Sequence, residues 1–254
     1  MSSLEGKVAL VTGGSRSLGK SVALTLAARG ADVLITYRSA KAEADETVSE
    51  IRDLGRRAVA LSVDLSGESA GDLVTAVAAA LGESFGGAKL DFLINNAGIN
   101  SQVPFSKVSL DELNKVFQVN YAAPFMLTQG LLPHMADGGR IVYIGSGTGR
   151  FVVPTMSAYG PLKAAVETLA RYVAAEVGPR NMTANAVSPG MLDTAFNKEG
   201  MESHPEVTDY ITRMTALNRL GKPDDVCGVI AFLCSPEAKF VTGQRIEVSG
   251  GIYL

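Results

Sequence analysis

The chain has 254 residues, 46% of them hydrophobic, and its 23 basic and 26 acidic side chains leave a net charge of -3. That length allows a large buried core, while the balanced charge argues against a surface for nucleic acid. No apolar run approaches the ~20 residues that span a bilayer, and residues 1–7 contain no basic segment followed by an apolar one. We expect a cytoplasmic protein without a signal peptide that binds neither nucleic acid nor a membrane.

The cysteines and histidines point to no disulfide and no metal site. Cys227 and Cys234 are seven residues apart within an apolar helical pattern. This spacing places them two turns apart on one helix face, beyond the reach of a disulfide, so we expect both to pack in the core of a reduced protein. His134 and His204 are far apart in the sequence, and no metal is expected.

Short apolar, β-branched runs alternate with longer helical stretches along the chain. The alternation is typical of βαβ units, so we predict a single α/β domain over residues 1–254, with a parallel sheet covered by helices on both faces. Helices are expected at residues 18–29, 42–54, 70–81 and 159–177. Seven buried strands are expected at residues 7–11, 31–36, 58–63, 90–95, 140–145, 183–187 and 244–248.

The first expected strand runs into the segment Thr-Gly-Gly-Ser-Arg-Ser-Leu-Gly at residues 12–19, where a helix begins. Glycines in such a turn let a pyrophosphate approach the helix N-terminus, whose free N–H groups attract anions. Gly13 and Gly19 are six residues apart with Ser17 between them, so the standard G-x-G-x-x-G spacing is absent. The position between the first strand and the first helix nevertheless favours a dinucleotide site.

The end of the second expected strand indicates which dinucleotide the protein binds. It reads Tyr37-Arg38-Ser39, without the acidic residue that would hold a ribose 2′-hydroxyl. Arg38 and Arg16 instead offer two guanidinium groups suited to a phosphate. Both could also be solvated surface arginines. We expect NADP(H), with NAD less favoured.

Tyr159 and Lys163 are four residues apart at the start of the long Ala-rich helix, and therefore share one face of it. A neighbouring cation favours the phenolate of a tyrosine, whose ordinary pKa is ~10, and so suits it to proton transfer near neutral pH. Ser146 follows the fifth expected strand and could hold the oxygen of a carbonyl substrate. Tyr-x-x-x-Lys also occurs by chance on solvated helix faces, and this alternative stays open for the motif alone.

The motifs together resemble those of the short-chain dehydrogenase/reductase family over nearly the whole chain. The matching positions are Thr12 to Gly19, Asn95-Asn96-Ala97-Gly98, Asn120, Ser146, Tyr159, Lys163, Pro189-Gly190 and Thr194. There are two departures. Ser17 stands where the family usually has Gly or Ala, and it would crowd the pyrophosphate turn. Pro161 lies inside the Tyr-x-x-x-Lys segment, where the first turn of a helix tolerates it.

The resemblance implies a Rossmann-type, doubly wound fold and an NADPH-dependent reductase of ketone or aldehyde carbonyls. Tyr159 would donate a proton, Lys163 would lower the pKa of Tyr159 and bind the nicotinamide ribose, Ser146 would stabilise the oxyanion, and Asn120 would anchor a water chain. The residues implied to bind the cofactor are Gly13, Ser15, Arg16, Ser17, Leu18, Gly19, Arg38, Ser39, Asp64, Leu65, Asn96, Ala97, Gly98, Tyr159, Lys163, Pro189, Gly190, Leu192 and Thr194.

The segment of residues 191–222 is too long for an ordinary connection and is expected to be a substrate lid. The side chains expected to face the substrate are mostly apolar, which suggests a carbonyl compound with a sizeable apolar part, although each one could simply be packing. They are Phe151, Val152, Val153, Met156, Met191, Phe196 and Met201, with Asn100, Ser101 and Gln102 on the opposite wall.

Three other functions are weighed. Among related enzymes the chain is most similar to 3-oxoacyl-acyl-carrier-protein reductases, and Arg180 matches an arginine that recognises the acidic carrier. Asp137 falls where a basic cluster is expected and would repel it, so a free carbonyl reductase is favoured. Ser188 lies near a G-x-S-x-G pattern, but a hydrolase also needs a histidine and only His204 follows. The third function weighed is that of a non-catalytic dinucleotide-binding protein, because a fold alone does not fix function.

By analogy with related enzymes, a homotetramer is expected.

Overall fold

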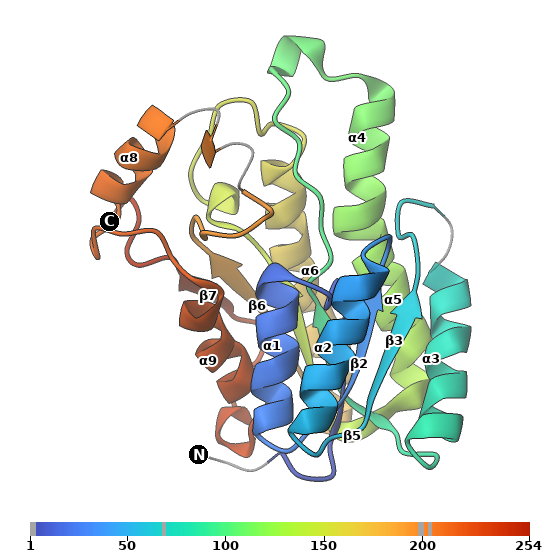
Figure 1. The fold of residues 1–254 in the computed structure, drawn as a ribbon. Coiled ribbons are helices and arrows are strands. Elements are labelled where there is room, and N and C mark those ends of the chain that lie inside the picture. Colours follow the sequence, from blue (N-terminus) through green and yellow to red (C-terminus); the bar gives the residue numbers. More distant parts are fainter. Residues whose placement is uncertain (1–3, 68–69, 198–200, 203–204) are drawn as a thin grey trace.

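The computed structural model describes residues 4–67, 70–197, 201–202 and 205–254. Within these residues, seven parallel strands form one sheet in the order β3-β2-β1-β4-β5-β6-β7 (Figure 1). This confirms the predicted doubly wound α/β fold. The strands are β1 Val8–Val11, β2 Asp32–Tyr37, β3 Ala58–Ser62, β4 Leu90–Asn95, β5 Met135–Ile144, β6 Thr183–Pro189 and β7 Arg245–Val248.

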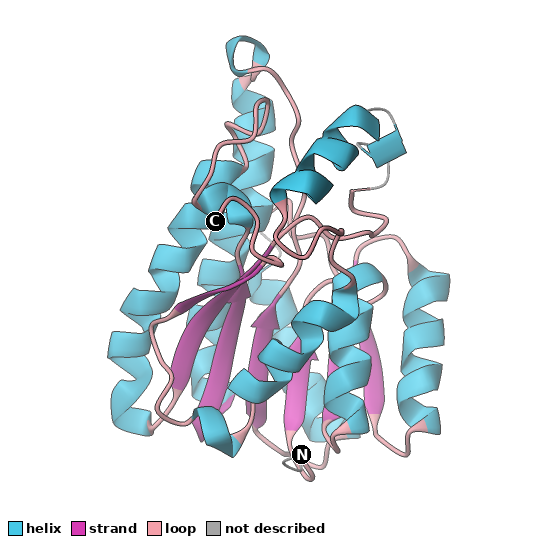
Figure 2. Cartoon of the chain, turned by 90° about the vertical axis from the view of Figure 1, so that its left-hand side faces the viewer, coloured by secondary structure: helices cyan, strands magenta, loops and turns pink. Residues whose placement is uncertain are grey.

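Helices cover both faces of the sheet (Figure 2). Along β1, Ala9 and Val11 belong to one hydrophobic core and Val8 and Leu10 to the other, because successive side chains of a strand point to opposite faces. Helices α1, α2 and α9 supply the first core, and α3, α5 and α6 supply the second. The helices are α1 Ser17–Ala28, α2 Lys41–Asp53, α3 Ala70–Ser84, α4 Leu110–Phe117, α5 Ala123–Leu131, α6 Gly160–Val177, α8 Pro205–Met214 and α9 Pro223–Leu233.

Short helical turns complete the chain between these elements. A π-helical turn, Gln118–Ala122, joins α4 to α5. The 3-10 turns are Phe105–Lys107, Leu132–His134, Gly147–Gly149, Gly178–Arg180 and Pro236–Ala238.

Strand β5 begins earlier than predicted. It starts at Met135 rather than at residue 140, and its pairing with β4 shifts register between Leu90 and Phe92. The irregularity coincides with the pair Gly138 and Gly139, of which Gly138 has a φ of +75°. Glycines carry no hydrophobic signal, so the sequence pattern did not reveal this first part of the strand.

Both cysteines pack in the core as predicted. Cys227 on α9 and Cys234 just after it are buried and free, in the same core as α1 and α2. Among the residues described, no helix combines the length and apolar character that a membrane crossing requires. His204 lies outside the described residues, as do parts of the segment expected to be a lid.

The order of the strands determines where a ligand site can form. All strands are parallel, so their carboxyl ends share one edge of the sheet, and the order reverses between β1 and β4. Open α/β sheets bind ligands in the crevice beside such a reversal. The motifs that follow β1, β4, β5 and β6 therefore meet at this edge, with α4 and α8 above it (Figure 1).

Candidate active site

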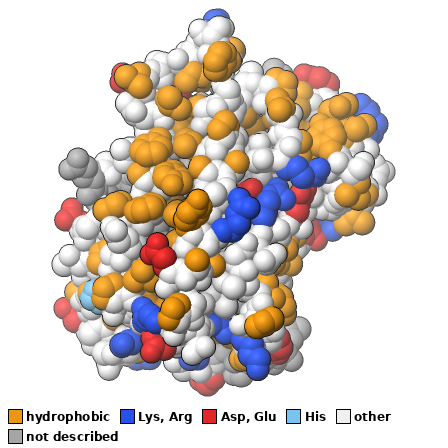
Figure 3. Space-filling model, turned by 180° about the vertical axis from the view of Figure 1, so that it is seen from behind, with side chains coloured by type: hydrophobic (Ala, Val, Ile, Leu, Met, Phe, Trp, Pro, Cys, Tyr) orange, Lys and Arg blue, Asp and Glu red, His pale blue; other side chains and the backbone are white. Residues whose placement is uncertain are grey.

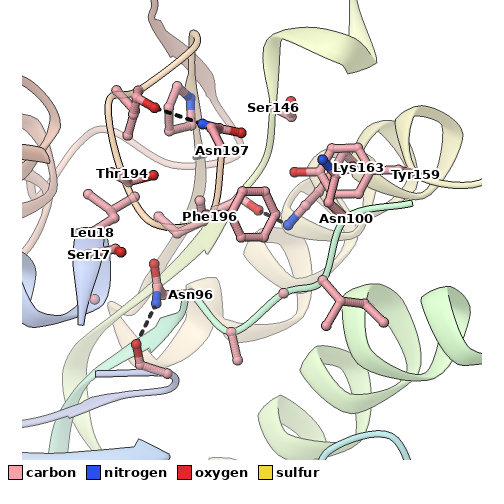
Figure 4. A pocket seen from close by; sticks show the side chains of 18 of the residues that line it. Ser17, Leu18, Asn96, Asn100, Ser146, Tyr159, Lys163, Thr194, Phe196 and Asn197 are labelled. Carbon is pink, nitrogen blue, oxygen red and sulfur yellow. Dashed lines mark hydrogen bonds between the residues drawn. The ribbon is translucent and has the colours of Figure 1, made fainter. Parts of the chain in front are cut away.

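A cavity of about 680 Å³ opens at the carboxyl edge of the sheet. Every residue predicted to bind the cofactor lines it, and so do Ser146, Tyr159 and Lys163. Figure 4 shows Ser146, Tyr159 and Lys163 on one side, and Ser17, Leu18 and Asn96 on the other. The structure thus brings together residues that are up to about 180 positions apart in the chain, as loop segments on a rigid sheet commonly do.

The Gly-rich turn and the Asn-Asn-Ala-Gly motif form one hydrogen-bonded unit. The Nδ2 of Asn96 donates to the carbonyl oxygens of Thr12 at 2.8 Å and Gly13 at 3.2 Å. In return, Thr12 Oγ1 accepts from the backbone N–H groups of Asn96 and Ala97, each at 3.0 Å. A Cβ on Gly19 would overlap the carbonyl oxygen of Gly13 and lie 2.6 Å from Asn96 Nδ2. The turn is therefore closed so tightly that position 19 requires glycine.

Ser17 begins α1 with a φ of +51°, in the left-handed region where glycine is favoured. A side chain there costs about 1 kcal/mol, because the Cβ approaches the following carbonyl oxygen. Ser17 is half-buried and lines the cavity. The backbone of this turn therefore keeps the left-handed conformation despite the serine, and what Ser17 adds is a small hydroxyl at the cavity wall.

The charged groups at the end of β2 fit a phosphate. Arg16 and Arg38 are both exposed and both line the cavity, and residues 37–39 contain no carboxylate. Asp64 lies nearby, and its carboxylate accepts from Ser66 N–H at 2.9 Å and Ser66 Oγ at 2.7 Å. These hydrogen bonds, with a smaller contribution from the charge of Arg38, hold the pKa of Asp64 below its ordinary value. An anionic ligand beside Asp64 would have to rely on the two guanidinium groups.

Tyr159 and Lys163 share one face at the start of α6. Tyr159 is the residue that precedes the helix, and its carbonyl oxygen accepts the first helical hydrogen bond from Lys163 N–H at 3.1 Å. Pro161 occupies the first turn, where its missing N–H is not needed, as predicted. Tyr159 is 7% exposed and Lys163 is 4% exposed. Lys163 Nζ donates to the carbonyl oxygen of Ile144 at 2.9 Å and lies 5.6 Å from the centroid of the Tyr159 ring.

The expected lowering of the Tyr159 pKa is wrong for the protein on its own. Burial raises the pKa of Tyr159 to about 12, although a hydrogen bond with Ser146 acts in the opposite direction. Burial also lowers the pKa of Lys163 to about 8, while the charge of Glu167 raises it. Desolvation penalises the charged forms of both side chains and is the largest cause of both pKa shifts.

Ser146 is held by the turn that follows it. Its Oγ accepts from Thr148 N–H at 3.2 Å and from Thr148 Oγ1 at 2.9 Å. With these two donors in place, the remaining hydrogen-bonding capacity of the Ser146 hydroxyl points to Tyr159, with which it also bonds. Thr148 lines the cavity and was not predicted.

Asn120 lies behind the cavity wall, in the π-helical turn Gln118–Ala122, and is 1% exposed. Its Nδ2 donates to the carbonyl oxygens of Ile99 and Val116, both at 3.0 Å. Its Oδ1 is buried and has no hydrogen-bond partner within the described part of the chain. A Cβ on Gly98 would lie 2.9 Å from this oxygen and 3.4 Å from Lys163 Nζ. Gly98 thus leaves an open approach between an unsatisfied acceptor and the lysine, a place suited to a water molecule.

Sequence reasoning missed Glu167, which is 8% exposed and lies behind the cavity wall, against the turn that carries Ser146. Its carboxylate accepts from Ser188 Oγ at 2.5 Å, from Ser146 N–H at 3.3 Å and from Arg245 Nε at 2.9 Å. The signal that could have revealed it is spacing, since Tyr159, Lys163 and Glu167 follow each other at steps of four residues on one helix face. Ser188 is fully buried and donates to this carboxylate, which is not the position of a hydrolase nucleophile.

Most residues predicted to face the substrate do line the cavity. Val152 does not, because it is 89% exposed, whereas its neighbours Phe151 and Val153 point inwards. Val152 therefore faces the solvent between two neighbours that face the cavity. Ser101 is buried, and neither it nor Met201 lines the cavity. The residues confirmed on the wall are Asn100, Gln102, Phe151, Val153, Met156, Met191 and Phe196, joined by Val207 and Ile211 of α8 and by Ile252.

Arg180 and Asp137 pair with each other. Arg180 Nε donates to Asp137 Oδ1 at 2.8 Å, and its other nitrogens donate to the carbonyl oxygens of Leu132 at 2.8 Å and Met135 at 2.6 Å. Arg180 follows the C-terminal end of α6 and Asp137 lies near the start of β5, so both are at the edge of the sheet opposite the cavity. The charge of Asp137, which was predicted to repel an acidic carrier, is thus neutralised by Arg180, the arginine that was matched to carrier binding.

The chain is similar to known proteins over nearly its whole length. Residues 13–253 match the family described as Enoyl-(Acyl carrier protein) reductase. An uncharacterized oxidoreductase of Methylorubrum extorquens is 37% identical over 253 residues, covering 99% of this chain and 100% of the relative. The promiscuous reductase LugOII, which catalyses keto-reduction at C1 during lugdunomycin biosynthesis, superposes with a TM-score of 0.93 and 36% identity over 100% of both chains.

A second solved structure has a bound ligand. The angucycline C-6 ketoreductase LanV, determined with bound NADP, gives a TM-score of 0.94 and 33% identity over 99% of this chain and 97% of that one. Both superpositions cover at least 99% of this chain.

Proposed function

Because the chain belongs to the short-chain dehydrogenase/reductase family of oxidoreductases, we propose that it reduces ketone or aldehyde carbonyls to alcohols with NADPH. The observation that carries this proposal is the position of Ser146, Tyr159 and Lys163 on one wall of the cavity whose other wall is the Gly-rich turn. A bound dinucleotide and a carbonyl compound would meet between these walls.

The residues of the cavity fit NADPH. The turn from Gly13 to Gly19 lines the cavity at the start of α1, where free backbone N–H groups would bind a pyrophosphate. Arg16 and Arg38 would bind the 2′-phosphate, Asp64 the adenine, and Lys163 the nicotinamide ribose. Leu192 and Thr194 would contact the nicotinamide end. When bound there, NADPH supplies the hydride that forms the new C–H bond of the alcohol.

Tyr159 is the proton donor in this proposal. A pKa of about 12 keeps its phenol protonated at neutral pH, which is the form that can donate. The O–H bond of Tyr159 breaks as the proton passes to the substrate oxygen, and the remaining phenolate is stabilised by the Lys163 ammonium. Ser146, held by Thr148, donates a hydrogen bond to the same oxygen as negative charge develops on it.

Asn120 would help to return a proton to Tyr159 by binding a water molecule. Its unsatisfied Oδ1 faces the space beside Gly98 and Lys163, which suits a bound water molecule between the two side chains. After each turnover Lys163 would pass one ammonium proton to the Tyr159 phenolate and take another from this water, which a chain of water molecules from the solvent would resupply.

The substrate pocket suits a carbonyl compound with a large apolar part. The ring of Phe196 lies 6.5 Å from the ring of Tyr159, so an apolar surface covers the place of proton transfer. Val207 and Ile211 of α8 line the cavity from the segment of residues 191–222, and we propose that this segment is a substrate lid in a single domain. The keto-reduction catalysed by LugOII and the ketoreductase activity of LanV support testing ketones first.

We propose that the substrate is free rather than attached to a carrier protein. Three N–H groups of Arg180 are occupied within the protein, so little of its guanidinium remains for an acidic partner. The matched test is turnover of one 3-oxoacyl group on a small thioester and on acyl-carrier protein. A preference of about a hundredfold for the carrier-linked form would contradict this part of the proposal.

We further propose a cytoplasmic homotetramer. Apolar side chains gather on the face seen in Figure 3, the side of the sheet that α5 and α6 cover. Large hydrophobic residues exposed on α4 and α5 would be buried against another subunit. They are Leu110, Leu113, Phe117, Phe125 and Met126. Sedimentation of the purified protein tests the assembly, and a monomer at micromolar concentration would contradict it.

The first experiment is NADPH and NADH oxidation over ketones, ketoesters and diketones, beside the variant Tyr159→Phe. We expect NADPH-dependent turnover that falls by about 100-fold or more in the variant, because the phenylalanine has no proton to donate. Unchanged NADPH binding by the variant, measured by cofactor fluorescence, is the control. Tight NADPH binding without turnover by the wild type on any carbonyl would favour the non-catalytic dinucleotide-binding protein instead.

A further inference from the structure

Glu167 is a buried carboxylate in contact with the catalytic wall, and the reaction proposed above does not use it. It lies on the same face of α6 as Tyr159 and Lys163. One carboxylate oxygen, Oε1, accepts from Ser188 Oγ at 2.5 Å and from Ser146 N–H at 3.3 Å. The other, Oε2, accepts from Arg245 Nε at 2.9 Å. A carboxylate that is only 8% exposed is thus stabilised by three donors from three segments.

The turn that carries Ser146 is shaped around this carboxylate. A Cβ on Gly145 would lie 2.5 Å from Glu167 Oε1, and a Cβ on Gly149 would lie 3.0 Å from Oε2. Glycine on both sides of the serine therefore lets the backbone approach the acid. The N–H of Ser146 points to the carboxylate, while its hydroxyl is directed to Tyr159.

Glu167 also connects this turn to the C-terminal wall of the cavity. Arg245 bridges Glu167 to Glu247, donating to Glu247 Oε2 at 2.8 Å. Glu247 accepts two hydrogen bonds from Arg150, both at 2.8 Å. Arg150 in turn donates to the carbonyl oxygen of Ile252 at 2.6 Å, and Ile252 lines the cavity. Charges of alternating sign thus run from α6 to the segment of Ile252 at the cavity wall.

We propose that Glu167 is a positioning residue of the reductase. By accepting the N–H of Ser146 it orients the serine hydroxyl toward Tyr159, and by its charge it stabilises the ammonium group of Lys163. This inference rests on the proposed carbonyl reduction. It also predicts a measurable property of Lys163 that does not depend on turnover.

The charges around the site give the direction of the pH effect. Among the described residues, the titratable or charged side chains that act on Lys163 and Tyr159 are these two residues themselves and Glu167 of α6. Arg245 of β7 faces Glu167 and is itself paired with Glu247. The neighbouring segments contribute uncharged groups, namely the side chains of Ser146 and Asn120 and the backbone carbonyl of Ile144. The charge of Glu167 raises the pKa of both Tyr159 and Lys163, so its removal lowers both. Activity that requires their protonated forms is then lost at lower pH.

Two substitutions separate the hydrogen bond from the charge. Glu167→Gln keeps an acceptor near Ser146 but removes the charge and places a donor beside Arg245. Glu167→Asp keeps the charge, and its shorter side chain draws the carboxylate away from Ser146 N–H. Glu176→Gln is the matched control, because Glu176 is an exposed glutamate on the same helix.

For Glu167→Gln we expect kcat to fall by about tenfold or more, with KM for NADPH changed by less than about threefold and the alkaline limb of the pH profile moved to lower pH. For Glu167→Asp we expect a similar fall in kcat, but the alkaline limb of the pH profile should stay at its wild-type position. Glu176→Gln is expected to resemble the wild type. Wild-type kcat and an unmoved limb in Glu167→Gln would overturn the proposal, as would a loss explained wholly by a smaller folded fraction.

Lys163 is then titrated without any substrate. Competitive acetylation across a pH series, with the peptide of Lys163 quantified by mass spectrometry, reports its protonation in the folded protein. We expect half-protonation near pH 8 in the wild type and at clearly lower pH in Glu167→Gln. An unchanged titration would refute the electrostatic part. Absence of carbonyl turnover by the wild type would instead contradict the proposed function, and the two failures are thereby distinguished.

Discussion

Lys163 Nζ donates a hydrogen bond to the carbonyl oxygen of Ile144 at 2.9 Å. Ile144 is the last residue of β5, so the end of this strand holds the ammonium group beside the ring of Tyr159. A single carbonyl compensates only part of the cost of burying a charge, and burial lowers the pKa of Lys163 to about 8. The charge of this lysine therefore changes within the pH range of an ordinary assay.

The pH dependence of reduction should follow this lysine. Lys163 is an ammonium group below pH 8 and neutral above it, and only the charged form stabilises the phenolate that remains after proton transfer. We expect kcat/KM for the carbonyl substrate to be constant below about pH 7 and to fall progressively above about pH 8. Initial rates in a constant-ionic-strength buffer series measure this. A rate that rises through this range would contradict the assignment.

Substitution of Gly19 should abolish cofactor binding. An alanine Cβ would overlap the carbonyl oxygen of Gly13 and crowd Asn96 Nδ2, so the turn must open. We expect Gly19→Ala to lower the free energy of unfolding by about 1–3 kcal/mol and to weaken NADPH binding severely. Denaturant titration and cofactor fluorescence measure the two effects.

Gly82→Ala is the matched control for this substitution. Gly82 lies in α3, and no atom comes within 4 Å of a Cβ placed on it. Alanine favours a helix over glycine by about 1 kcal/mol, so this variant should be slightly more stable and bind NADPH normally. Equal destabilisation of both variants would show that a side chain is no more restricted at position 19 than at position 82.

Replacement of Ser17 by glycine should stabilise the protein. The φ of +51° at Ser17 is strained for serine and not for glycine, so Ser17→Gly is expected to raise the free energy of unfolding by up to about 1 kcal/mol. Ser21→Gly, in the regular part of the same helix, should lower it by up to about 0.5 kcal/mol, because serine lies between alanine and glycine in helix propensity. The opposite signs of the two changes in chemical denaturation form the test, and a loss of stability in both would contradict the strain at Ser17.

Arg38 should select NADPH over NADH. Its exposed guanidinium lies at the end of β2 on the cavity wall, where a 2′-phosphate would be bound. We expect Arg38→Ala to raise KM for NADPH by about tenfold or more, because a hydrogen bond to a charged group is worth about 1.5–3 kcal/mol. KM for NADH should be unchanged and serves as the internal control. A parallel rise for both cofactors would place Arg38 elsewhere on the dinucleotide.

Much of the fold followed from local patterns. The runs at 90–95 and 183–187 are short and mostly apolar, and β4 and β6 are buried along their whole length, so such strands are recognisable without knowledge of their partners. Strand β5 was partly missed, since its first residues include Gly138 and Gly139 and carry little hydrophobic signal. The orientation of Val152 was also missed, because this irregular loop turns it to the solvent, whereas Phe151 and Val153 were placed correctly.

The sequence by itself determined which chemical groups the site contains, because the turn at 12–19 and the four-residue step from Tyr159 to Lys163 depend only on neighbouring residues. Only the tertiary structure decided how these groups behave. It buried Tyr159 so deeply that its pKa rises to about 12, and it placed the carboxylate of Glu167 against the N–H of Ser146. Protonation depends on desolvation and on charges brought in by distant segments, and these are properties of packing that spacing along the chain does not contain.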